Sequence, residues 1–183
     1  MKITRLVVPL ITVAMVGCSS QSKPQQSLQF TATWVQTLPS GQITKDVTAS
    51  GDRFKIVETS SGGQVVKIYD GQKLFQTGAL GGQKGSADPA NERSVSYLRF
   101  WNWPPEGAST TGESVLGRET MLYESKEPIS NTTFRRFVDK ETGILLKQQQ
   151  LHSGPNINPQ TDSIEECQKI VFGEVDPNVF SIP

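Results

Sequence analysis

Apolar and polar side chains alternate along much of the chain, in short runs separated by turn residues. Phe30, Ala32 and Trp34 occupy every second position of residues 30–37, and Phe54 and Ile56 repeat the pattern in residues 53–59. A period of two is that of a β-strand, and turns spaced by about eight to twelve residues are typical of antiparallel all-β domains. The same features predict further strands at 43–49, 65–69, 73–77, 114–125, 132–139, 144–151 and 163–172.

Three segments depart from this alternation. Residues 78–89 contain four glycines and few large apolar groups, which indicates a loop. Residues 91–103 place apolar side chains at helical spacing, and two prolines then stop the pattern, which predicts one helix. The tail 176–183 contains prolines, which lack the donors of a central strand. We therefore expect its apolar residues, Phe180 and Ile182, to plug one end of the sheet.

The N-terminus has the pattern of a targeting segment. Lys2 and Arg5 precede an apolar run over residues 6–17. This run would make about 18 Å of helix, short of a bilayer core of about 30 Å. The run ends at Cys18, and Met-Val-Gly-Cys resembles a bacterial lipobox. The alternatives are a signal peptide cleaved elsewhere and a buried apolar strand.

The sequence divides into three parts on this interpretation. Residues 1–17 are the lipoprotein signal peptide, residues 18–26 are the lipidated Cys18 with a polar tether, and residues 27–183 are the β domain. Acyl chains on Cys18 (palmitate among them) would hold the domain on a membrane surface, because each buried methylene contributes about 0.8 kcal/mol.

The charge balance excludes one class of function. The chain carries 18 basic and 18 acidic side chains, and removal of residues 1–17 leaves a net charge of −2. Without a basic excess to neutralise phosphates, nucleic-acid binding is not expected. Two cysteines and one histidine exclude a disulfide scaffold and a multi-cysteine zinc module. Cys167 is interpreted as a small buried apolar residue, with a reactive thiol as the alternative.

The residues that catalysis requires are nearly absent. His152 is the only histidine, at a strand end that runs into a loop, and no Gly-x-Ser-x-Gly or phosphate-binding glycine motif occurs. Glu165 and Glu166 are adjacent in a predicted strand, so their carboxylates point to opposite faces. We predict a protein that is not an enzyme, with no catalytic residues, no metal site and no cofactor.

Several weak motifs occur in a recognisable order. They are the aromatic first strand, Arg53-Phe54-Lys55-Ile56, the hairpin at 68–75, Gly117-Arg118, the segment 137–147 and the closing aspartate, phenylalanine and proline of 176–183. Together they resemble the LolA/LolB-like superfamily of periplasmic lipoprotein carriers and receptors, over about 150 residues.

This resemblance implies a mainly β (α+β) fold. A strongly curved antiparallel sheet forms an unclosed half-barrel, and one or more helices cover its concave face. That face is apolar and accepts acyl chains. The lining residues carried over from the resemblance are Trp34, Phe54, Ile56, Ile68, Phe75, Leu98, Trp101, Phe134 and Leu146. Soluble carriers begin with an amphipathic helix that lids the barrel, whereas residues 18–29 here form a polar tether. This difference resembles the anchored receptor end of such a pathway, or a divergent lipoprotein with another role.

The predicted function is a lipid-anchored bacterial envelope lipoprotein that binds acyl chains of lipids or lipoproteins, with outer-membrane lipoprotein sorting as the role the resemblance implies. Ser19 permits placement on the outer membrane, facing the periplasm. The alternative is an envelope protein-interaction or sensor domain of the same fold. Composition alone favours aromatic side chains that simply pack sheet against helix. A continuous apolar cavity beneath residues 95–103 would support ligand binding, and a fully packed interior would contradict it.

Overall fold

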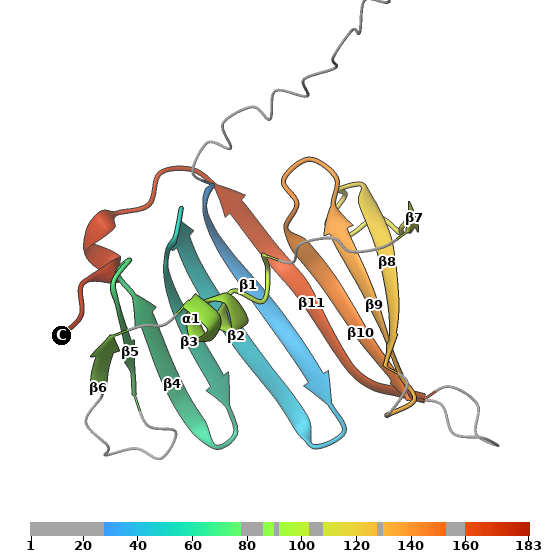
Figure 1. Cartoon of the computed structure of the whole chain (residues 1–183), viewed down its shortest axis with the longest axis horizontal. Coiled ribbons are helices and arrows are strands. Elements are labelled where there is room, and N and C mark those ends of the chain that lie inside the picture. The colour runs from blue at the N-terminus through green and yellow to red at the C-terminus, as the bar shows by residue number, and fades with distance from the viewer. Residues whose placement is uncertain (1–27, 78–85, 90–91, 103–107, 128–129, 153–159) are drawn as a thin grey trace, which may run out of the picture.

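Eleven strands form one antiparallel sheet in the order β6-β5-β4-β3-β2-β1-β11-β10-β9-β8-β7 (Figure 1). The structure is a computed structural model, and it describes residues 28–77, 86–89, 92–102, 108–127, 130–152 and 160–183. The strands are β1 Gln29–Leu38, β2 Gly41–Ser50, β3 Arg53–Ser60, β4 Gly63–Tyr69, β5 Lys73–Gln76, β6 Ser86–Pro89, β7 Ser109–Thr111, β8 Thr120–Glu127, β9 Thr132–Asp139, β10 Leu145–His152 and β11 Gln160–Phe172.

The predicted fold class is confirmed. The sheet is unclosed, because β6 and β7 lie at its two edges and do not pair with one another among the described strands. The first five strands match the alternation in the sequence closely. One α-helix occurs in the described part of the chain, α1 (Glu92–Leu98), and it lies across the sheet near β2 and β3 (Figure 1). None of the helices in the described ranges is long and apolar enough to span a membrane.

The structure differs from the predicted elements in two regions. The helix is shorter than the predicted 91–103, because residues 99–102 leave the helical path and carry Trp101 onto the sheet. The strand predicted at 114–125 begins only at Thr120, since residues 115–118 form a tight turn. The short edge strands β6 and β7 were not expected, and the remainder of the predicted glycine loop, residues 78–85, lies outside the described residues.

The chain's first and last strands are neighbours in the middle of the sheet. β1 pairs with β2 along its whole length and with β11 on its other side, where Phe30 faces Phe172 and Thr37 faces Ile164. A β-bulge shifts this register between Thr33 and Trp34. The start of β1 and the end of β11 therefore lie at one end of the sheet, together with the β9–β10 loop (Figure 1).

Both faces of the sheet carry apolar clusters. The larger one covers the concave face, under α1 and residues 99–102. The smaller one lies on the opposite face of β4 and β5, where the 3-10 helix η1 (Pro177–Phe180) buries Phe180 against Ile68 and Phe75. The C-terminal tail thus covers a face of the sheet, whereas the sequence predicted that it would plug an end.

The predicted signal peptide, Cys18 and the tether up to residue 26 lie outside the described residues, and so do Trp103 and the two prolines that follow it.

Candidate functional site

Aromatic side chains fill the concave face beneath residues 95–102. The Trp101 ring is 5% exposed and lies at the centre of the group. Its ring centroid lies 6.0 Å from that of Phe30, 5.7 Å from that of Phe54 and 5.2 Å from that of Phe100, in edge-to-face geometry. Such edge-to-face pairs are a favoured arrangement for aromatic rings in protein interiors. Side chains therefore occupy the space in which the sequence predicted an acyl chain.

Two hydrogen bonds hold this group to the sheet. The Trp34 indole Nε1 donates to the Leu145 carbonyl oxygen at 3.3 Å, and the Leu145 amide donates to the Trp101 carbonyl oxygen at 2.9 Å. A buried indole N–H requires an acceptor, so the first bond orients Trp34 toward β10. The second bond fixes the backbone of residues 99–102 on the sheet. In the described part of the chain, residues 99–102 therefore follow the sheet where the sequence predicted a continuation of the helix.

The structure brings together most of the residues that were predicted to line one apolar face. Six of the nine belong to the concave cluster, namely Trp34, Phe54, Ile56, Leu98, Trp101 and Leu146. Ile68 and Phe75 belong to the cluster under the tail, because Ile68 pairs with Lys55 and so faces away from Ile56. The prediction that these two share the concave lining is wrong. Ligand binding by the other residues stays a prediction.

The ninth residue, Phe134, belongs to neither cluster and marks a polar part of the concave face. The Arg136 guanidinium lies 4.8 Å from the centroid of the Phe134 ring. Arg136 is 8% exposed, and its Nε and Nη1 donate to Gln148 Oε1 and Ser125 Oγ, each at 2.8 Å. Burial lowers the pKa of Arg136 below its ordinary value. The half of the sheet built from β8 to β10 therefore offers hydrogen-bonding groups where an acyl carrier needs an apolar wall.

An ion pair lies where the apolar and polar parts of the concave face meet. Lys45 Nζ lies 2.6 Å from Glu165 Oε1, and both side chains are largely buried. The same ammonium group lies 4.7 Å from the centroid of the Phe100 ring. The two charges compensate one another, which burial requires. The Lys45–Glu165 pair thus marks the boundary between the aromatic cluster and the polar part of the concave face.

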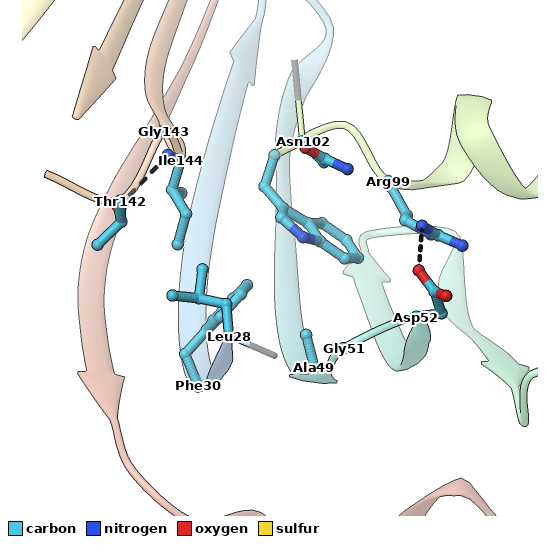
Figure 2. A pocket seen from close by; sticks show the side chains of 11 residues that line it. Leu28, Phe30, Ala49, Gly51, Asp52, Arg99, Asn102, Thr142, Gly143 and Ile144 are labelled. Atoms are coloured by element: carbon cyan, nitrogen blue, oxygen red, sulfur yellow. Dashed lines mark hydrogen bonds and ion pairs between the residues drawn. The ribbon is translucent and has the colours of Figure 1, made fainter. Parts of the chain in front are cut away.

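A pocket of about 310 Å³ opens at the end of the half-barrel where β1 begins (Figure 2). Its apolar floor comes from Leu28, Phe30, Ala49, Trp101 and Ile144, and its rim from Gly51, Asp52, Arg99, Asn102, Thr142 and Gly143. Ligand pockets in proteins occupy about 300–1,000 Å³, so this one is at the lower limit. It can hold one large side chain or a short apolar tail.

Strand ends and turns hold the walls of this pocket. On one side, the Gly51 amide donates to the Leu28 carbonyl oxygen at 3.1 Å, and Arg99 Nη1 lies 3.0 Å from Asp52 Oδ1 (Figure 2). On the other side, Gly143 takes a φ of +74°, which a glycine adopts without a steric cost, and its amide donates to the Asp139 carbonyl oxygen at 2.9 Å. The pocket is therefore built into the fold.

One polar atom at the pocket lacks a partner. The Nε of Arg99 is buried, with no hydrogen-bond acceptor in the part of the chain that the structure describes. A buried donor without an acceptor costs about 1–3 kcal/mol. An acceptor oxygen on a bound molecule would remove this cost if it reached the Arg99 guanidinium.

The sequence prediction found only Trp101 among the residues of this pocket. Phe30 alternates with Trp34 and was visible as a core position, but nothing in the sequence placed it at an open end. Leu28 comes immediately before β1, Ala49 lies just before the β2–β3 turn, and Ile144 follows the β9–β10 turn. Their common location depends on the pairing of β1 with β2 and on the β9–β10 loop, which the sequence does not encode locally.

The residues with reactive side chains lie apart from this pocket. His152 is exposed at the end of β10. Cys167 is buried in the concave cluster, as predicted, and burial raises the pKa of its thiol to about 12. In the described ranges, no three histidine, cysteine or acidic side chains gather as a metal site would require.

Comparisons with known proteins give the fold a context. No protein-family model and no curated protein sequence matches the chain. Among solved structures, the complex of MucA and MucB from Pseudomonas aeruginosa matches with a TM-score of 0.56 at 17% identity, over 83% of this chain and 54% of the matched chain. A structure of MucB in complex with MucA(peri) matches with a TM-score of 0.53 at 16% identity, over 83% and 53%.

A further structure of MucB matches with a TM-score of 0.54 at 14% identity, over 87% of this chain and 58% of that chain. This chain therefore spans a little over half the length of the chains it matches. At these identities the likeness concerns the fold alone.

Proposed function

We propose that the chain is a non-enzymatic protein-binding domain of the bacterial envelope, anchored through Cys18 and facing the periplasm. The observation that carries this proposal is the likeness to MucB over more than four-fifths of this chain, since two of the matched structures hold MucB in complex with MucA. The filled concave face also supports it, because beneath residues 95–102 aromatic rings occupy the space a carrier would keep for its cargo.

Photo-crosslinking in the native envelope, followed by reconstitution, tests this proposal. A photoreactive benzoylphenylalanine replaces Tyr97, which is 88% exposed on α1, or in a second variant Ser61, in the exposed β3–β4 turn. A protein crosslinked at either position is identified, purified and titrated against the full mature chain. Saturable binding with a defined stoichiometry is the expected result. If no crosslinked protein binds the purified chain, the chain is not a protein-binding domain.

A second candidate function is the binding of an apolar ligand, and the pocket beside Leu28 favours it. The apolar floor of the pocket and the buried Arg99 Nε fit a short acyl tail that ends in a carboxylate or ester. Native mass spectrometry of the full mature chain, with and without added fatty acid, measures this directly. Binding that Arg99→Ala abolishes without lowering the urea midpoint of the chain, while Tyr97→Ala leaves binding unchanged, would assign the ligand to this pocket. Without a mass shift in the unsubstituted chain, the pocket does not bind such a tail.

The anchor is a separate part of the proposal and has its own test. Cells that produce the chain are labelled with palmitate, and the membrane and soluble fractions are compared for the chain and for Cys18→Ala. We expect the substitution to remove the label and to release the chain from the membrane. Label retained in Cys18→Ala would place acylation elsewhere. Fractionation of the two envelope membranes then tests the outer-membrane location that Ser19 suggests.

A further inference from the structure

Three of the four large apolar side chains that stand exposed among the described residues lie at one end of the half-barrel. They are Leu116 at 46% exposure, Val171 at 50% and Phe172 at 37%. Val171 and Phe172 end β11 and pair with Thr31 and Phe30 at the start of β1. Leu116 precedes Arg118, whose guanidinium lies 5.1 Å from the centroid of the Phe172 ring. We call this end of the sheet, with these three side chains, the tether rim.

Leu116 occupies a conformation that leucine disfavours. Its φ is +54°, and the following Gly117 has a φ of +72°. The backbone groups of Val115 and Arg118 close this turn with two hydrogen bonds of 3.1 and 2.9 Å. The left-handed conformation costs a residue with a Cβ about 1–2 kcal/mol. Here that cost is combined with exposure of an apolar side chain, so Leu116 does not serve the stability of the isolated fold. Such strained positions concentrate where a protein contacts something else.

The tether rim is also the end at which the chain arrives from Cys18. Gln29 begins β1 beside it, and the Gly173 amide donates to the Gln29 carbonyl oxygen at 3.2 Å (Figure 1). Ten residues, 18 to 27, separate the start of the mature chain from Leu28. Fully extended, they span at most about 36 Å. The opposite end of β1 lies about 33 Å further away, since a strand rises about 3.3 Å per residue. The tether therefore joins the domain at this end, and this end reaches the membrane with the least extension of the tether.

We propose that the tether rim rests on the lipid surface that holds Cys18, with Leu116, Val171 and Phe172 in the interfacial layer of the bilayer. The inference rests on the anchoring part of the proposed function. An anchored domain stays within the length of its tether from the bilayer. The effective concentration of lipid near the tether is therefore high, and exposed apolar side chains beside the tether bury against it. The pocket beside Leu28 then opens toward the membrane, and the β3–β4 turn points away from it.

Quenching by labelled lipid tests this orientation on the full lipidated chain. The variants L116C and V171C carry a nitrobenzoxadiazole (NBD) fluorophore at the rim. The controls S61C and Y97C carry it at exposed positions away from the rim. Each protein is reconstituted into phosphatidylcholine vesicles that contain doxyl-labelled phosphatidylcholine. The native Cys167 is 1% exposed and does not compete for the label.

We expect at least threefold stronger quenching at residues 116 and 171 than at 61 and 97, with a shift of emission to shorter wavelength only at the rim. Equal quenching at all four positions overturns the orientation, while flotation of the chain with the vesicles still supports the anchor. A chain that does not float overturns both. If residues 116 and 171 become shielded only when a protein partner is added, the rim is a protein surface, and the membrane contact is overturned. Partner binding measured in detergent tests the protein-binding proposal independently.

Discussion

Truncation of Trp101 tests whether the concave face is a packed core. The side chain is 5% exposed and its ring contacts those of Phe30, Trp34, Phe54 and Phe100. Replacement of a buried tryptophan by alanine costs about 3–5 kcal/mol. Because the ring stands at the centre of four others, we expect about 4 kcal/mol for W101A. Domains of this size have unfolding free energies of about 5–15 kcal/mol, so the variant folds with a much reduced margin.

Urea unfolding of the mature chain in a Cys18→Ser background, which cannot be acylated, measures this cost. With a slope of about 2 kcal/mol per molar urea, 4 kcal/mol lowers the midpoint by about 2 M. The thermal midpoint is expected to fall by about 8–16 °C. Y97A serves as the matched control, because the Tyr97 side chain is 88% exposed and its loss is expected to change stability by no more than about 0.5 kcal/mol.

A W101A midpoint within about 0.5 M urea of the unsubstituted chain would refute the packed arrangement. The same would follow if W101A and Y97A were equally destabilising, because burial could not then be the cause. If a fatty acid restored the stability of W101A, it would occupy the space vacated by the indole, as apolar molecules do in engineered cavities, and this would confirm that the indole fills that space in the native chain.

Three other predictions concern local features. An alanine Cβ at Gly112 would clash with Thr120 Oγ1 and lie 3.1 Å from the Phe137 ring, so G112A is expected to lower the free energy of unfolding by about 2 kcal/mol in the same urea assay; an unchanged midpoint would contradict it. L116N is expected to raise that free energy by about 0.5–1 kcal/mol, because asparagine tolerates a positive φ, and a loss of stability would show that Leu116 packs in the fold. In the Cys18→Ser background, Ellman's reagent at pH 8 is expected to find no reactive thiol until the chain is unfolded, because burial raises the pKa of Cys167 from 9.0 to about 12. Rapid reaction of the folded chain would refute this burial. Because the folded state favours the protonated thiol, the contribution of Cys167 to the free energy of unfolding is expected to be fully present below pH 9 and to be lost as the pH rises toward 12.

The strands could be predicted because their signal is local. Phe54 and Ile56 share a face in β3 as alternation requires, and a turn bounds each of the first strands. Alternation says which residues share a face, but it does not say which face they take. The family resemblance assigned Ile68 to the concave side, but its pairing with Lys55 places it on the other. The tail that covers it, with Phe180, comes more than a hundred residues later in the chain.

The candidate site was less accessible to prediction, because it depends on contacts between distant segments. Helical spacing of Val95, Leu98 and Trp101 predicted one continuous helix, but the Trp101 carbonyl oxygen accepts from the Leu145 amide and residues 99–102 follow the sheet. The pocket beside Leu28 likewise exists only because the β2–β3 turn and the β9–β10 loop meet there. Neither contact leaves a periodic pattern in the sequence.

The pairing of β1 with β11 has a consequence for how the molecule forms. β1 separates one half of the sheet, β2 to β6, from the other, β7 to β11, and the seam between the halves joins Phe30 to Phe172. The first half can assemble by successive hairpins, but one edge of β1 stays open until β11 pairs with it. Closing so long a loop is slow. Completion of the sheet therefore waits for the pairing of two strands that lie more than 120 residues apart in the sequence, so β1 and β11 are expected to be the last neighbours to join.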